Sequence, residues 1–169
     1  MKLLSVELCG EKLLMHIGSI AAESAYLERY TETLLYKLTR LNRDVGRPII
    51  EAPMLGGKLD LLLEVGKARL KNRQKKQAEF RQLISRIKNA NADRATAVHG
   101  IWIPDISQGI IDSIRNPRPI ASKRGKPGKP DVTLAADRAE KLAEEIYNGH
   151  VGLHAFARKA WPKLFPPTP

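Results

Sequence analysis

The chain has 169 residues, of which 43% are hydrophobic and 28% are charged. This length suits one domain, and this composition excludes collagen-like, mucin-like and wholly disordered chains. The net charge of +11 makes a polyanion the first partner to consider.

The first predicted element is a long amphipathic helix over residues 13–41. Its inward positions recur at alternating steps of four and three residues, and charged residues stand between them. The segment 42–48 contains glycine and proline and is expected to end this helix. A second, shorter helix is predicted over residues 55–70 from the spacing of its leucines.

The second half of the chain predicts several kinds of element in succession. Residues 75–98 repeat the apolar stripe and predict a third helix. After Gly100, isoleucines and prolines predict short extended segments, and the basic, Gly- and Pro-rich residues 115–131 predict a mobile loop. Thr133 is expected to cap a fourth helix, which precedes a Pro-rich tail over residues 161–169.

These elements together predict an all-α fold. Four amphipathic helices with short connections favour an up-and-down four-helix bundle, with a short extended or β segment and a basic loop before the last helix. Residues 1–160 are expected to form one helical domain that includes the loop. The single cysteine, Cys9, and the absence of a long apolar run in the sequence favour a cytoplasmic protein that does not contact membranes.

The segment from Asp93 to Trp102 contains the residues that are the clearest candidates for catalysis. Arg94 continues the inward stripe of the third helix, where a charged side chain is costly unless it is paired. His99 lies five residues further on, just before Gly100, a residue suited to ending a helix. In a continuing helix Arg94 and His99 stand about 140° apart around the axis, whereas unwinding of the last turn would let them converge.

This segment resembles the HEPN superfamily, whose members are helical bundles marked by an arginine, four to six intervening residues and a histidine. Arg94, four residues and His99 fit that spacing, and residues 99–102, His-Gly-Ile-Trp, are similar to the His-Gly-x-Trp ending common in one bacterial branch. The layout is also similar over about 140 residues, with Glu28 on the first helix and the motif at the close of the third.

The resemblance implies a metal-independent ribonuclease that acts as a homodimer, with both motifs lining one cleft. His99 would move protons at the ribose 2′-hydroxyl and the leaving oxygen, and Arg94 would stabilise the pentacoordinate phosphate. Asp93, Glu28 and Trp102 are the supporting residues of this hypothesis, and no metal or cofactor is expected. Such proteins often serve in toxin–antitoxin or phage-defence systems, so an acidic antitoxin is a candidate partner beside RNA.

Other interpretations remain open for the same residues. Arg94 can be a structural arginine paired with Glu28 or Glu32, and Trp102 can be a core anchor. Ala95 follows Arg94 at the position where active HEPN nucleases commonly carry asparagine. The alternative function is therefore a catalytically inactive bundle that binds nucleic acid or an acidic partner protein, and a third is a structural oligomer built on the first helix.

Positive charge is concentrated in two segments. Residues 67–88 contain nine basic residues and one acidic residue, and residues 115–129 contain six basic residues and no acidic one, which leaves −3 for the rest of the chain. An ordinary exposed helix mixes both signs to form i, i+4 pairs, so this excess favours binding to a polyanion. The residues predicted to contact nucleic acid are Lys71, Arg73, Lys75, Lys76, Arg81, Arg86, Lys123, Arg124 and Lys126.

Overall fold

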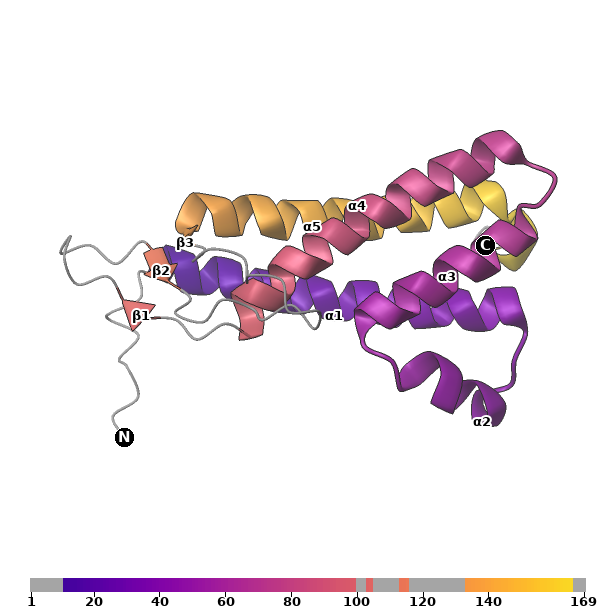
Figure 1. Cartoon of the computed structure of the whole chain (residues 1–169), viewed down its shortest axis with the longest axis horizontal. Coiled ribbons are helices and arrows are strands. Elements are labelled where there is room, and N and C mark those ends of the chain that lie inside the picture. The colour runs from indigo at the N-terminus through magenta and orange to yellow at the C-terminus, as the bar shows by residue number, and fades with distance from the viewer. Residues whose placement is uncertain (1–10, 100–102, 105–112, 116–132, 166–169) are drawn as a thin grey trace, which may run out of the picture. The chain divides into compact units, whose positions relative to one another are not determined.

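Helices form most of the structure described for this chain, in agreement with the predicted helical fold. The structure is a computed structural model and describes residues 11–99, 103–104, 113–115 and 133–165 (Figure 1). Its strands are β1 (Ile103–Pro104), β2 (Ser113–Arg115) and β3 (Thr133–Ala135). Its helices are α1 (Glu11–Thr39), α2 (Arg43–Gly46), the π-helix η2 (Arg47–Glu51), α3 (Leu55–Arg69), α4 (Gln74–His99), α5 (Ala136–Ala160) and the 3₁₀ helix η4 (Pro162–Leu164).

The residues divide into two compact units. The first unit contains Met1–Ala22 and Ala92–Glu144, and the second contains Glu23–Asn91 and Glu145–Pro169. Helices α1, α4 and α5 therefore contribute residues to both units.

In the second unit, the core is built from the inner faces of α1, α3, α4 and α5. The stripe predicted on the first helix is confirmed there, because Ser24, Leu27, Thr31, Leu34 and Leu38 are all buried. The Thr31 hydroxyl donates a hydrogen bond of 2.8 Å to the carbonyl of Leu27, so this polar side chain is satisfied within the core. The other helices add Leu59, Leu62, Phe80, Ile84, Ile87, Ile146, Leu153 and Ala157.

The direction of α3 corrects the predicted up-and-down order. Lys58, near the start of α3, pairs with Glu28 and Glu32 of α1. Arg69, at the end of α3, donates to the carbonyl of Leu38 at the end of α1. Helices α1 and α3 therefore run in the same direction (Figure 1). This is possible because the connection between them, which contains α2 and η2, is long enough to bring the chain back along α1 before α3 begins.

The segment predicted to stop the first helix does so, but it also forms helical turns of its own. Helix α1 ends just before Arg40, which takes a positive φ of 60°. The side chain of Asn42 then accepts a hydrogen bond of 2.9 Å from the backbone N–H of Val45 and caps α2. Pro48 stands in the first turn of η2, where a missing N–H leaves no helical bond unmade.

Two glycines let neighbouring helices of the second unit approach closely. A Cβ atom on Gly66 of α3 would lie 2.1 Å from a ring carbon of Phe80 on α4. A Cβ atom on Gly149 of α5 would lie 2.9 Å from Cγ1 of Ile87 on α4. Phe80 also stacks on Phe156 of α5, with ring centroids 5.1 Å apart. Helix α4 therefore packs tightly against both α3 and α5.

In the first unit, the three strands form an antiparallel sheet in the order β1-β2-β3. Ile103 pairs with Arg115, and Arg115 pairs in turn with Thr133. The prediction that Thr133 caps the last helix is therefore wrong: this residue begins β3, and α5 begins at Ala136. The physical reason is pairing with β2, since a β-branched threonine fits a strand well and its backbone is engaged in the ladder.

Several predicted segments fall wholly or partly outside the described residues. Of the loop predicted over residues 115–131, only Arg115 is described. Lys123, Arg124, Lys126 and Trp102 lie outside the described residues. Of the tail predicted over residues 161–169, residues 161–165 are described and include η4. Among the described helices, none combines the length and apolar character needed to cross a membrane.

Candidate functional site

The predicted catalytic pair lies in the last turns of α4. The helix continues through His99, so positions 94 and 99 remain about 140° apart around its axis, and unwinding before His99 does not bring them together. Arg94 is partly buried, and its Nε atom is buried without a hydrogen-bond partner among the described residues. Asp93 is exposed. The structure thus places an unused arginine donor at this site, while the His99 side chain lies outside what is described.

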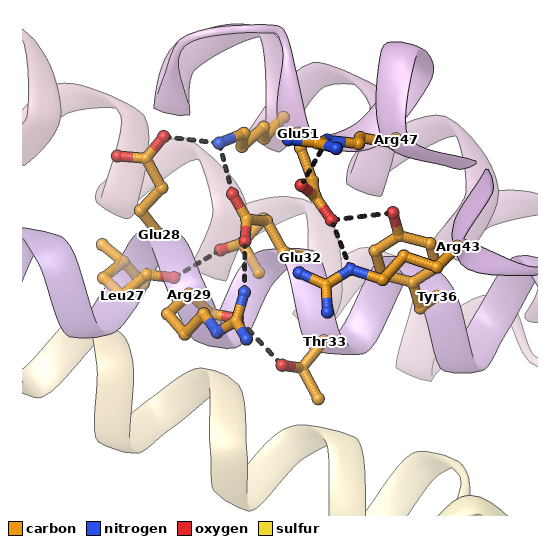
Figure 2. A network of polar contacts seen from close by, with 11 residues as sticks. Leu27, Glu28, Arg29, Glu32, Thr33, Tyr36, Arg43, Arg47 and Glu51 are labelled. Carbon is orange, nitrogen blue, oxygen red and sulfur yellow. Dashed lines mark hydrogen bonds and ion pairs between the residues drawn. The ribbon is translucent and has the colours of Figure 1, made fainter. Parts of the chain in front are cut away.

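The two carboxylates considered as partners of Arg94 hold a different cation. Glu28 and Glu32 lie one turn apart on α1 (Figure 2), and the Nζ atom of Lys58 lies 2.6 Å from a carboxylate oxygen of each. Only 3% of the Lys58 side chain is exposed. Burial by itself lowers the pKa of this ammonium, but hydrogen bonds and the charges of both carboxylates outweigh burial and raise the pKa above 10.5. Glu28 is therefore a structural partner of Lys58.

Lys58 is a residue that the sequence interpretation missed, although a signal for it existed. It stands between Leu55 and Leu62 at helical spacing, on the face of α3 that these leucines bury. A lysine on such a face needs a carboxylate on the neighbouring helix, for the same reason that was applied to Arg94.

A second group of polar contacts centres on Glu51 of the connection 40–54 and includes one hydrogen bond to α1 (Figure 2). The Tyr36 hydroxyl donates a hydrogen bond of 3.0 Å to Oε1 of Glu51. Arg43 and Arg47 lie 3.3 and 3.6 Å from the same carboxylate. Although partial desolvation opposes ionisation, the hydrogen bond from Tyr36 and the two guanidinium groups together lower the pKa of Glu51. These contacts fix the connection that sets the direction of α3.

Part of the predicted nucleic-acid-binding segment is used to cap helix ends. Arg73 Nη1 donates a hydrogen bond of 3.0 Å to the carbonyl of Ala160, and Lys76 Nζ donates one of 3.0 Å to the carbonyl of Lys159. Both carbonyls belong to the last turn of α5, where cations compensate the helix dipole. Arg73 and Lys76 therefore have a structural role in the second unit, which the sequence interpretation did not assign to them.

Four other cationic side chains of this segment are exposed. Within the described residues, no side-chain hydrogen bond or ion pair engages them. They are Lys71, Lys75, Arg81 and Arg86. All four belong to the second unit, whereas Arg94 and His99 belong to the first. They remain available to a partner with negative charge.

His16 of the first unit is another residue that the sequence interpretation missed. It is 7% exposed, and its Nε2 atom lies 4.0 Å from Oε2 of Glu140 on α5. That nitrogen is buried and makes no hydrogen bond to a described residue. The first unit thus holds two buried nitrogen atoms without a described hydrogen-bond partner, one on His16 and one on Arg94.

The second unit contains a cluster of one tyrosine and two histidines. The Tyr30 ring on α1 lies 5.6 Å from the His150 ring and 5.2 Å from the His154 ring, measured between centroids. Burial raises the pKa of Tyr30 to about 12. Burial, followed by the positive charges of Arg158 and His150, lowers the pKa of His154 from 6.5. The folded protein therefore favours neutral forms of both Tyr30 and His154.

The lowered pKa of His154 predicts a dependence of stability on pH. A depressed folded pKa contributes stability that is present above the ordinary value of 6.5 and is lost as the pH falls through the folded value. Urea unfolding of the wild type and of His154→Gln, at about pH 7.5 and about pH 5, tests this. We expect the free energy of unfolding of the wild type, relative to the variant, to fall on acidification. An equal difference at both pH values contradicts the assignment.

Among the described residues, no three His, Cys, Asp or Glu side chains are grouped as metal ligands. Comparison of the chain with protein families, with curated proteins and with solved structures finds no significant match.

Proposed function

We propose that this chain is a HEPN-like helical protein that binds RNA through cations of the second unit. The observation that carries the proposal is a set of exposed cations, Lys71, Lys75, Arg81 and Arg86, that have no side-chain partner among the described residues. A surface cation without an intramolecular partner is free to replace a counterion on a phosphate, and several together give affinity for nucleic acid. The sequence also predicts Lys123, Arg124 and Lys126 as nucleic-acid-binding residues.

We further propose that bound RNA is cleaved by Arg94 and His99. The Nε atom of Arg94 supports this, because it is buried and makes no hydrogen bond to a described residue, and an arginine donor that no structural contact uses can serve a phosphate. In the reaction, His99 takes the proton of the 2′-hydroxyl, which attacks the adjacent phosphorus. The 5′-oxygen of the next nucleotide leaves and is protonated, and a 2′,3′-cyclic phosphate is formed.

The separation of positions 94 and 99 around α4 favours a homodimer as the active form. Two side chains that start from different faces of one helix do not easily meet on one phosphate. A cleft between two copies can instead take the arginine from one and the histidine from the other. Asp93, Glu28 and Trp102 remain the proposed supporting residues, and Glu28 also binds Lys58.

The alternative function is binding without cleavage, to RNA or to an acidic partner protein such as an antitoxin. The same four exposed cations favour it, and Ala95, which follows Arg94, is its sequence support. It differs from the first proposal because Arg94 and His99 then do not cleave RNA.

Two triple variants test the RNA-binding part of the proposal. The triple variant Lys75→Gln/Arg81→Gln/Arg86→Gln is expected to bind single-stranded RNA roughly tenfold more weakly at about 0.1 M salt. The control triple Arg138→Gln/Lys141→Gln/Lys159→Gln removes equal charge from exposed side chains elsewhere and is expected to change affinity less than about threefold. Equal losses in the two triples contradict binding by residues 75–86.

Cleavage is measured on the same RNA in EDTA. The wild type is expected to produce 2′,3′-cyclic phosphate ends, and both His99→Ala and Arg94→Ala are expected to abolish them while they bind RNA as the wild type does. No cleavage by the wild type, or equal cleavage by the wild type and His99→Ala, rejects the nuclease and leaves the alternative.

A further inference from the structure

A groove of about 410 Å³ opens between α4 and α5 in the second unit. This volume lies within the range of about 300–1,000 Å³ that is usual for sites of small organic ligands. The groove is lined by Leu83, Arg86, Ile87, Asn89, Glu145, Asn148 and Gly149. All seven residues belong to the second unit, so the groove lies within one compact unit.

The floor of the groove is apolar and closely packed. Ile87 of α4 is buried, and a Cβ atom added to Gly149 of α5 would lie 2.9 Å from its Cγ1 atom. A Cβ atom on Gly152, almost one turn later, would lie 3.2 Å from Cδ1 of Leu83, which is partly buried. The two glycines therefore bring α5 close against α4 at the base of the groove, where Leu83 and Ile87 line it with hydrocarbon.

Four exposed polar side chains line the same groove. They are Arg86 and Asn89 of α4, and Glu145 and Asn148 of α5. Arg86 and Glu145 carry opposite charges, yet no ion pair joins them to each other or to another described residue. Each asparagine amide has donors and an acceptor, and neither amide makes a hydrogen bond to a described residue. The groove therefore offers a cation, an anion and two amides to a ligand.

The charges of the lining select the kind of ligand. Among the described residues of the lining there is one cation and one anion, so the net charge is zero. A polyanion is disfavoured, because Glu145 repels phosphates as strongly as Arg86 attracts them. A zwitterion fits both residues, because a guanidinium binds a carboxylate through paired hydrogen bonds and a carboxylate binds an ammonium. A peptide group has one N–H and one C=O, which match the amides of Asn89 and Asn148.

We propose that this groove binds a short zwitterionic peptide with apolar side chains. Arg86 binds its C-terminal carboxylate, and Glu145 binds its N-terminal ammonium. Asn89 and Asn148 hydrogen-bond to the peptide group between them, and the apolar side chains lie on the floor of the groove. This inference does not rest on the proposed function, because Arg86 is the only residue that it shares with the proposed RNA-binding set.

The test is an NMR titration of the whole chain with leucyl-leucine at about 0.1 M salt. Saturable binding is expected, with a dissociation constant below about 1 mM. Glu145→Gln is expected to weaken binding at least about fivefold, because the ammonium loses its counter-charge. The control Glu144→Gln removes the same charge from the preceding exposed residue, which lies outside the lining, and is expected to change affinity less than about twofold.

Peptides with blocked ends assign each terminal charge to its partner. N-acetyl-leucyl-leucine has no ammonium, so its affinities for the wild type and Glu145→Gln are expected to agree within about twofold. Leucyl-leucine amide has no carboxylate, so its affinities for the wild type and Arg86→Gln are expected to agree within about twofold. Free leucine has no peptide group and is expected to bind the wild type at least about fivefold more weakly than leucyl-leucine.

Three results overturn the proposal: no saturable binding of leucyl-leucine up to about 10 mM, equal weakening by Glu145→Gln and Glu144→Gln, or leucine binding as tight as leucyl-leucine binding. Titration with RNA separates this site from the proposed function. RNA affinity is expected to fall in Arg86→Gln and to stay within about threefold of the wild type in Glu145→Gln. A wild type that binds the peptide and not RNA rejects the proposed function alone.

Discussion

Replacing Lys58 with methionine is expected to lower the free energy of unfolding by about 3 kcal/mol. The substitution removes the cation that lies 2.6 Å from both Glu28 and Glu32, and only 13% of the Glu32 side chain is exposed. Glu28 then has no counter-charge and Glu32 keeps only the exposed Arg29, whose Nη1 lies 3.3 Å from it, while methionine replaces none of the hydrogen bonds of Lys58. Urea unfolding at neutral pH measures the loss.

The control for this prediction neutralises all three members of the group. In Lys58→Met/Glu28→Gln/Glu32→Gln the three charges of the group are removed together, and Arg29, which loses its ion pair with Glu32, is 68% exposed, so at least half of the lost stability is expected to return. Glu28→Gln alone is expected to cost less than Lys58→Met, because Glu28 is 34% exposed and Lys58 keeps its bond to Glu32. If Lys58→Met costs less than about 1 kcal/mol, the group is not a principal stabilising contact.

Replacing Gly66 with alanine is expected to cost about 2 kcal/mol, although alanine is the better helix former. The added Cβ atom would lie 2.1 Å from one carbon of the Phe80 ring and within 2.9 Å of two others. Phe80 cannot move aside freely, because it packs against Phe156 and Trp161. Helices α3 and α4 must therefore separate, and thermal or urea unfolding reports the loss.

Gly18 of α1 supplies a matched control for Gly66. Apart from its chain neighbours and the backbone of α1, no described atom lies within 4 Å of a Cβ atom placed there, so Gly18→Ala gains helix propensity without a clash and is expected to stabilise the protein by up to about 1 kcal/mol. The pair Gly66→Ala/Phe80→Leu, which shortens the opposing side chain, is expected to lose less than the sum of its two single changes. Equal effects of alanine at positions 18 and 66 contradict the close contact between α3 and α4.

The long helices were predictable because each carries a sustained apolar stripe. Residues 13–41, 55–70 and 75–98 lie within one or two residues of α1, α3 and α4, and burial of Leu27, Leu34 and Phe80 follows the predicted stripe. The direction of α3 was not predictable in this way. The turns α2 and η2 contain four and five residues, too few to show a helical period, and their effect depends on the contacts of Glu51.

The candidate site was predictable in its residue types but not in their partners. The inward place of Arg94 followed from helical spacing, and the structure finds it partly buried. Spacing along one helix does not say which ends of other helices lie nearby, so the use of Arg73 at the α5 carbonyls could not be foreseen. For the same reason the sequence leaves Glu28 and Glu32 as alternative partners of Arg94, whereas both bind Lys58 in the structure, where α1 and α3 run parallel.

The dependence of RNA affinity on salt tests the central claim most directly. For single-stranded RNA, each phosphate contact contributes about −0.7 to the slope of log affinity against log salt, so the four exposed cations from Lys71 to Arg86 predict a slope of about −3 or steeper. The variant Lys75→Gln/Arg81→Gln/Arg86→Gln is expected to be shallower than the wild type by about 2. A wild-type slope near zero, or the same slope in the wild type and the variant, would contradict RNA binding by these residues.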